Sequence, residues 1–155
     1  MAAFEFSRST LVAASPAVVH ALIDDFHRWE TWSPWEDVDP NLRRAYSGSD
    51  SGVGARYEWR GNRRAGEGSM EITRSSAERI GVDLHFTKPF KADHEIEFVL
   101  TPAAGGTKVD WVMRGDNSGL AAVFAKVMPT EKMVGKDFEK GLARLKRAAE
   151  SEATG

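Results

Sequence analysis

Three residues of the types that bind metals or move protons fall close together near the N-terminus. His20, Asp24 and His27 are spaced i, i+4 and i+7, so one face of an unbroken helix would present all three to a metal ion. The spacing lacks the glutamate of a His-Glu-x-x-His motif, and the helical pattern weakens near Asp25. Exposed polar faces often produce such triplets, so we expect no metal here.

Two other polar segments contain residue types that bind ions. Glu36, Asp37 and Asp39 could hold a divalent cation, although a solvated acidic loop is the more common outcome. The sequence SGSDSGVG at 47–54 lacks the lysine and the serine or threonine of a phosphate-binding loop, so it predicts a turn. The chain has no cysteine, which excludes thiolate ligands and a cysteine nucleophile. We therefore expect no cofactor.

Basic and acidic residues alternate in the middle of the chain. Five arginines, at 56, 60, 63, 64 and 74, are interleaved with Glu58, Glu67 and Glu71. Opposite charges on neighbouring strands stabilise a sheet, so we expect cross-strand ion pairs on its outer face. A ligand carboxylate would meet Arg63 or Arg64 if their turn borders a cavity.

Strand periodicity places two ionisable side chains on the inner face of a sheet. Side chains alternate between the two faces of a strand, so His94 shares a face with Ile96, Phe98 and Leu100. By the same rule Tyr57 lies beside Ala55 and Trp59, whereas Arg56 and Glu58 point outward. An inward histidine is more often a structural, hydrogen-bonded residue than a catalyst.

These residues must be positioned by strands and helices that the pattern predicts. Alternating segments bounded by glycine, proline and serine predict an antiparallel meander after a first strand at 4–13. Short connections make sequential strands neighbours. The meander strands are expected at 42–47, 54–60, 66–74, 79–87, 92–101 and 107–115.

Helices are expected on both sides of the meander. Ser15 and Pro16 suit the start of a helix that runs to about residue 25, with a second turn to about Trp32. Pro129 separates a shorter helix at 120–128 from a long one beginning at Thr130. The apolar stripe of the long helix consists of Val134, Phe138, Leu142, Leu145 and Ala149.

Length and composition indicate one globular domain. The chain has 155 residues, of which 41% are hydrophobic and 28% charged, and its net charge of −2 offers no basic surface for nucleic acid. No apolar run approaches the ~20 residues of a membrane span, and the first residues lack a signal-peptide pattern. We expect a cytoplasmic protein without membrane insertion, with a domain at 1–150 and a frayed tail at 151–155.

Three of the five tryptophans fall within seven residues, at positions 29, 32 and 35. Trp29 and Trp32 share a face if the helix persists, so we expect them to pin the short helices to the sheet. The segment therefore predicts a structural corner, with Trp32 or Trp35 contributing to the rim of a site.

Six segments in this order resemble one known superfamily. They are RWETWSPWE, GVGARYEWRGN, GEGSMEIT, KPFKADHEIEF, GTKVDWVMRG and KMVGKDFEKGLARLK. Together they are similar to the polyketide cyclase/dehydrase branch of the START-like, or SRPBCC, helix-grip superfamily, over residues 4–149. The resemblance implies an α+β helix-grip fold, in which a seven-stranded curved antiparallel sheet wraps around a long C-terminal helix, with two short helices between the first two strands.

The resemblance also implies a cavity between sheet and helix that binds a hydrophobic or aromatic small molecule. Members include cyclases, lipid carriers and hormone receptors, so the fold does not fix the chemistry. With strand alternation, the expected ligand contacts are Tyr57, Trp59, Met70, Ile72, Phe86, His94, Phe98, Trp111 and Met113. The same side chains would also suit a packed core.

Several functions stay open at this point. His94 is the one candidate for a catalytic group, because the inward set has neither paired carboxylates nor a nucleophile with its base. Cyclase or dehydrase chemistry, a non-catalytic lipid or small-molecule carrier, and a co-chaperone-like interaction module are the alternatives, and a homodimer is an open possibility.

Overall fold

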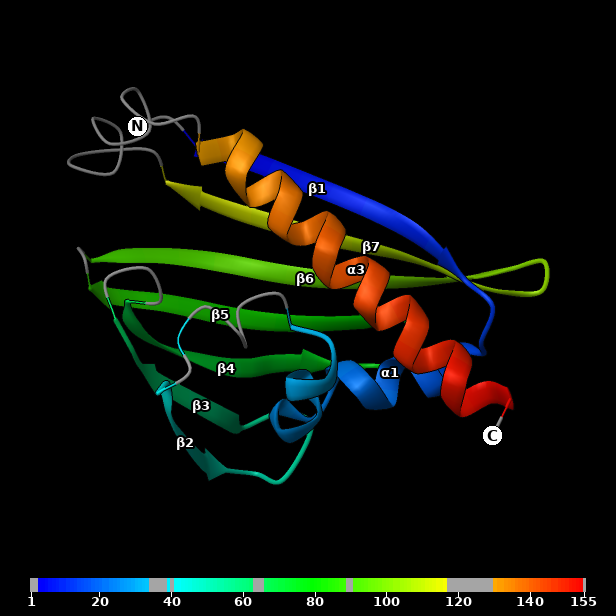
Figure 1. The fold of residues 1–155 in the computed structure, drawn as a ribbon, viewed down its shortest axis with the longest axis horizontal. Helices are drawn as coiled ribbons and strands as arrows, with labels where there is room; N and C mark the ends of the chain where they lie inside the picture. Colours follow the sequence, from blue (N-terminus) through cyan, green and yellow to red (C-terminus); the bar gives the residue numbers. More distant parts are fainter. Residues whose placement is uncertain are drawn as a thin grey trace.

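The computed structural model describes residues 3–33, 39, 41–62, 66–88, 91–116 and 130–154. Within these ranges, seven antiparallel strands form one curved sheet in the order β1-β7-β6-β5-β4-β3-β2 (Figure 1). The meander predicted from the sequence is confirmed, and the first strand closes it by pairing with the last. The strands are β1 (Ala3–Val12), β2 (Arg43–Gly48), β3 (Ala55–Arg60), β4 (Glu67–Ser75), β5 (Arg79–Lys88), β6 (Ala92–Ala103) and β7 (Gly106–Asp116).

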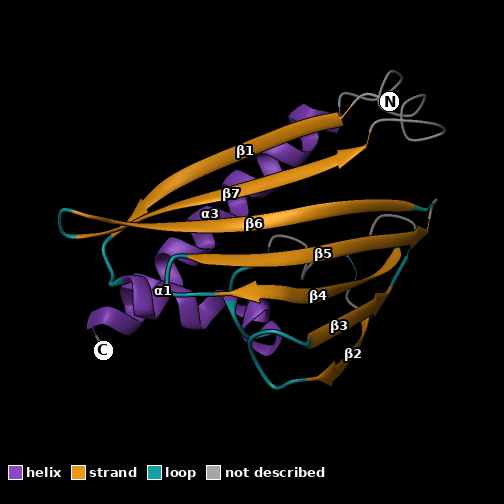
Figure 2. Ribbon diagram, turned by 180° about the vertical axis from the view of Figure 1, so that it is seen from behind, coloured by secondary structure: helices purple, strands orange, loops and turns teal. Residues whose placement is uncertain are grey.

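The described helices all lie on one face of this sheet. They are α1 (Pro16–Ile23), the 3-10 helix η1 (Phe26–Thr31) and α3 (Thr130–Thr154). Figure 2, seen from behind, shows the strands in front of the helices, so the outer face carries no described helix. The expected helix-grip architecture is thus confirmed, while the expected helix at 120–128 lies outside the described residues. None of the described helices is long and apolar enough to cross a membrane.

The first helix begins and ends as its local sequence requires. The Ser15 hydroxyl accepts a hydrogen bond from the N–H of Val18, and Pro16 occupies the first turn, where its missing N–H leaves no bond unmade. The α-helix ends at Ile23, two residues before the predicted end. Asp25 then caps η1 by accepting from the N–H of His27 at 2.9 Å.

Two tryptophans attach η1 to α1: Trp29 lies within η1, and Trp32 follows its last residue. The Trp29 indole donates to the carbonyl of Ile23 at 2.7 Å, and the Trp32 indole donates to the carbonyl of Leu22 at 2.9 Å. The last carbonyls of a helix have no partner within it, so the two indoles satisfy buried acceptors. The predicted corner is confirmed. Trp32 is fully buried, however, so its expected place on a rim is wrong; Trp35 lies outside the described residues.

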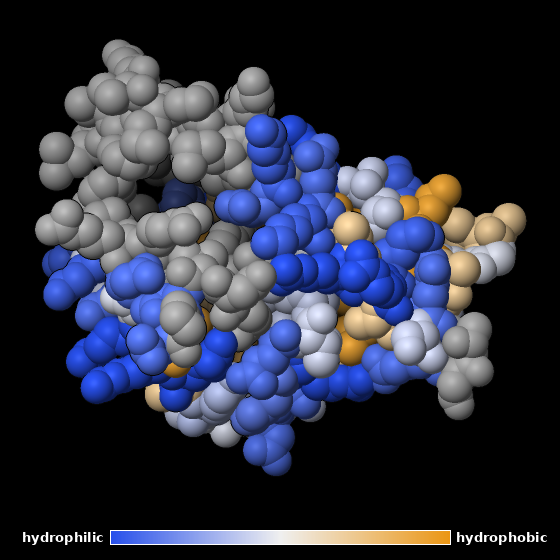
Figure 3. Space-filling view, in the orientation of Figure 1, coloured by the Kyte–Doolittle hydropathy of each residue, from blue (hydrophilic) through white to orange (hydrophobic). Residues whose placement is uncertain are grey.

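The long helix covers the sheet with an apolar stripe. Phe138, Leu142, Leu145 and Ala149 are buried as predicted, whereas the side chain of Val134 is outside the described set. Hydrophilic side chains cover much of the exposed surface of α3 (Figure 3).

The end of α3 differs from the frayed tail expected from residue 151. The helix continues to Thr154, and its last turns hold two contacts with the N-terminal half of the chain. Glu152 pairs with Arg28 of η1, and Glu150 accepts from the N–H of Ala13 at 2.9 Å. These long-range contacts explain why the helix extends past its apolar stripe.

Trp32 is the residue on which we expect this packing to depend most. Replacing Trp32 with alanine removes a fully buried ring and leaves the Leu22 carbonyl without its donor, so the free energy of unfolding should fall by about 3–5 kcal/mol. Chemical denaturation measures this loss. Leu11, which is 63% exposed, provides the control, because Leu11→Ala should change stability by less than about 0.5 kcal/mol. Equal losses in the two variants would contradict the assignment.

Candidate functional site

The inner face of the sheet divides into two halves along the strands. In the half beside α1, buried aromatic rings contact one another between the sheet and the helices. Trp111 stacks on Phe138 with ring centroids 4.1 Å apart, and Trp32 meets Trp111 edge-on at 5.6 Å. Phe98 completes this cluster 5.0 Å from Trp111, and all four side chains are buried. This half is a packed core.

The other half of the inner face keeps its apolar side chains partly accessible. It lies where β3, β5 and β7 end and where β4 and β6 begin. Because neighbouring strands are antiparallel, these strand termini all lie at the same end of the sheet. Five of the predicted site residues gather there half-buried: Trp59, Met70, Phe86, His94 and Met113. We call these five residues the inner-face cluster.

The strand register places the members of the inner-face cluster side by side. Met70 on β4 is directly opposite Tyr57, and Leu84 on β5 lies between Met70 and His94. The rings of Trp59 and Phe86 meet edge-on at 5.5 Å, and Phe86 meets His94 edge-on at 6.0 Å. The members on β3, β4, β5 and β6 are therefore neighbours across four strands, and Met113 lies on the fifth, β7, opposite Ile96.

Gly68 makes room for the largest ring of the cluster. A Cβ atom at this position would lie 2.6 Å from the Trp59 indole and 2.3 Å from the carbonyl oxygen of His85. Only glycine allows the indole to lie this close to β4, opposite its own strand position. Strand alternation alone does not reveal this role of Gly68, although an isolated glycine in a strand is a signal of such a close approach.

His94 is the polar member of the cluster, and its surroundings favour the neutral imidazole. Burial among apolar neighbours lowers the pKa of His94 below its usual 6.5, and the nearby carboxylate of Asp93 offsets part of that effect. Asp93 itself bonds to His85 on the outer face, with 2.6 Å between Oδ1 and Nδ1. A neutral imidazole has one hydrogen-bond donor and one acceptor.

The triplet His20, Asp24 and His27 is not brought together. The Ser75 hydroxyl donates to Asp24 at 2.6 Å and lies 3.3 Å from Nε2 of His20, which fastens the end of α1 to β4. Because the α-helix stops at Ile23, His27 turns away and bonds to Asp25 instead. The described residues contain no group of three or more acidic or histidine side chains arranged for a metal.

Asp39 has a structural role. Its two carboxylate oxygens accept from the N–H groups of Asn41 and Asn62, both at 2.8 Å, and the residue is buried. Glu36 and Asp37 lie outside the described residues.

The predicted ion pairs on the outer face are present. Arg56 pairs with Glu71 at 3.7 Å and Arg60 with Glu67 at 3.5 Å, each across neighbouring strands. Arg63 and Arg64 lie outside the described residues.

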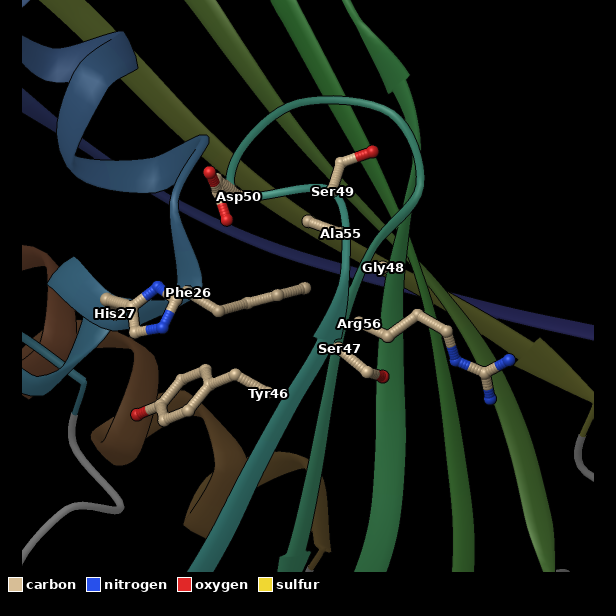
Figure 4. A pocket seen from close by; sticks show the side chains of 9 residues that line it. All are labelled: Phe26, His27, Tyr46, Ser47, Gly48, Ser49, Asp50, Ala55 and Arg56. Carbon is tan, nitrogen blue, oxygen red and sulfur yellow. The ribbon is translucent and has the colours of Figure 1, made fainter.

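A hollow of about 130 Å³ lies between η1 and the β2–β3 hairpin. In Figure 4 the side chains of Phe26, His27 and Tyr46 lie close together, while the guanidinium of Arg56 points away from them. The His27 and Tyr46 rings stack at 4.0 Å and so fill much of the space between η1 and β2. This hollow is small, and two of the rings that line it already contact each other.

The sequence matches a known family over nearly its whole length. Residues 3–150 match the family described as polyketide cyclase/dehydrase and lipid transport. The chain belongs to this family. A search of curated proteins finds no match to the sequence.

Solved structures agree with this family membership at the level of the fold. The solution structure of KanY superposes with a TM-score of 0.69 at 16% identity, covering 97% of this chain and 99% of KanY. Protein CV1439 of Chromobacterium violaceum gives 0.66 at 15% identity, over 94% and 96% of the two chains. The Aha1 dimer of Colwellia psychrerythraea gives 0.59 at 18% identity, over 95% and 96%.

The nine site residues predicted from the sequence all lie on the inner face, but in different surroundings. Ile72, Phe98 and Trp111 are fully buried, and Tyr57 is 7% exposed, so their packing favours a structural role. The other five form the inner-face cluster. Contact of any of the nine with a ligand stays a prediction.

The lowered pKa of His94 predicts a specific pH dependence of stability. Below about pH 6.5 the unfolded chain binds a proton that the folded protein does not, so stability should fall as pH drops through this range to the folded-state pKa. His94→Gln removes this contribution while keeping a polar side chain. Denaturation at a series of pH values should therefore show a smaller loss on acidification for the variant. Identical pH profiles would contradict burial as the cause.

Proposed function

We propose that the protein binds a hydrophobic or aromatic small molecule over the inner-face cluster, between the sheet and the residues that face it. The observation that carries the proposal is the cluster itself, in which Trp59, Met70, Phe86 and Met113 remain half-buried although they face inward. Removing apolar surface from water contributes roughly 25 cal/mol per Å², so a ligand that covers these side chains gains affinity. Membership of the family supports the same conclusion.

Binding is better supported than catalysis. Among the described inner-face residues there is no carboxylate pair and no nucleophile placed beside a base, and His94 is the candidate for proton transfer within the inner-face cluster. We therefore propose a binder first. Cyclase or dehydrase chemistry, in which the site positions the substrate and His94 transfers a proton, is the alternative. A lipid carrier would bind its ligand in the same way but would catalyse no reaction.

Two further predictions concern location and assembly. A cytoplasmic location stays the prediction made from the sequence. A co-chaperone-like role or a homodimer would agree in fold with the Aha1 dimer, and a surface for a protein partner would then replace the ligand site.

The proposal is tested by ligand-dependent thermal stabilisation. Wild-type protein should be stabilised by at least one compound among aromatic polyketides, fatty acids and sterols, because a ligand that binds only the folded state raises its melting temperature. Trp59→Ala should remove that shift, since the indole forms part of the cluster.

Trp111→Phe is the matched control. Trp111 is 1% exposed and belongs to the packed core, so this variant should melt at a lower temperature yet keep the ligand-dependent shift. A shift that survives in Trp59→Ala and disappears in Trp111→Phe would place the ligand elsewhere and contradict the proposal.

A further inference from the structure

β1 is one of the two edge strands of the sheet, and its last residues lie beside the second half of α3 (Figure 1). Among the described strands, β1 pairs with β7 alone. The free edge of a strand presents backbone N–H and C=O groups that can pair with a strand of another chain. The contacts of this edge therefore decide whether β1 can serve as an interface.

Two hydrogen bonds show which backbone groups of β1 point away from β7. The Ser7 carbonyl accepts from Nη1 of its neighbour Arg8 at 2.8 Å. The Leu11 carbonyl accepts from Nζ of Lys146, on α3, at 2.9 Å. Alternate residues of an antiparallel strand direct their backbone groups to the same side, so Ser9 faces the same way as Ser7 and Leu11. We call these three residues the β1 edge.

Lys146 and Glu150 cover the end of the β1 edge as a pair. They are four residues apart on α3, and Nζ of Lys146 is 2.6 Å from Oε2 of Glu150. The same Oε2 accepts from the N–H of Ala13 at 2.9 Å. The hydrogen bonds from Ala13 and Lys146 lower the pKa of Glu150, so its carboxylate is charged at neutral pH. A partner strand would need the Leu11 carbonyl and the Ala13 N–H, and both are occupied.

The side chains along β1 suit a second copy of the same chain as the partner. In an antiparallel pair of β1 strands centred on Ser9, Ser9 faces its own copy. Arg8 then lies opposite Thr10, Ser7 opposite Leu11, and Glu5 opposite Ala13. Like charges placed directly opposite each other destabilise a strand pair, and these pairs contain none. Such a contact uses the same residues on both copies and closes as a dimer.

We propose that Lys146 and Glu150 keep the β1 edge closed to a second copy of this chain, and that without them two copies pair antiparallel through β1, centred on Ser9. The contact between α3 and β1 thus prevents self-association through this strand, in addition to holding the helix on the sheet. This surface is separate from the inner-face cluster, so the inference does not depend on the proposed function.

A single introduced cysteine tests this pairing, because the chain has no cysteine of its own. Ser9→Cys places a thiol at the centre of the paired strands, where the two Cα atoms would lie about 5.5 Å apart, within reach of a disulfide. Added oxidised glutathione converts the two thiols into the disulfide and is itself reduced to two glutathione molecules. In Ser9→Cys combined with Lys146→Ala and Glu150→Ala, the covalent dimer should form at least about tenfold faster than in Ser9→Cys alone, because pairing raises the effective concentration of the thiols.

Two controls separate this pairing from general association. Ser7→Cys, combined with the same two alanine replacements, should form covalent dimers slowly, because the two copies of residue 7 would lie four positions apart along the strands, or about 13 Å. Arg147 is exposed and follows Lys146 on α3, so Arg147→Ala should leave the rate of Ser9→Cys unchanged.

Lys146→Met provides a milder variant, because it keeps the aliphatic part of the side chain but donates no hydrogen bond. It should also accelerate dimer formation by Ser9→Cys, and it decides the test if thermal melting shows that the double alanine replacement prevents folding. Equal rates with and without these replacements, or equally fast dimers from Ser7→Cys, would overturn the proposal and leave the proposed binding function untouched.

Discussion

The structure depends on two indole N–H groups that bond to the last carbonyls of α1. Trp29 and Trp32 bond to Ile23 and Leu22, which lets η1 turn back under α1 without leaving buried acceptors unmatched. Phenylalanine would fill only part of the same space and could not donate a hydrogen bond. Once Trp32 is held in this way, its ring reaches both Phe98 and Trp111, and the helical corner and the sheet become one core.

Aromatic rings fill only one half of the inner face, which explains why the apolar side chains of the other half remain accessible. The rings of Trp32, Phe98, Trp111 and Phe138 occupy the space between α3 and the strands near α1. The inner-face cluster lies toward the other ends of the strands, where its apolar members pack against this core but stay half-buried. Because Gly68 has no side chain, the Trp59 indole packs directly against β4 and borders the cluster. One sheet thus combines a rigid core with an accessible apolar surface.

Strand alternation and the order of elements were enough to predict the fold class, the meander and the side chains that point inward. Tyr57, Ile72, Phe98 and Trp111 are buried because period-two patterning dictates the face of each residue. Patterning could not show which inward residues would be covered, because that depends on helices far away in the sequence. The extended end of α3 was missed for the same reason, since Glu150 and Glu152 find their partners in the N-terminal half of the chain.

The central claim is that a ligand contacts the inner-face cluster, and the methionine methyl groups test it most directly. The chain has five methionines, and Met70 and Met113 belong to the cluster. With methyl-labelled methionine and a bound ring compound, intermolecular nuclear Overhauser effects should reach the methyl groups of Met70 and Met113. Saturable binding with no such effect at either methyl group would contradict the account.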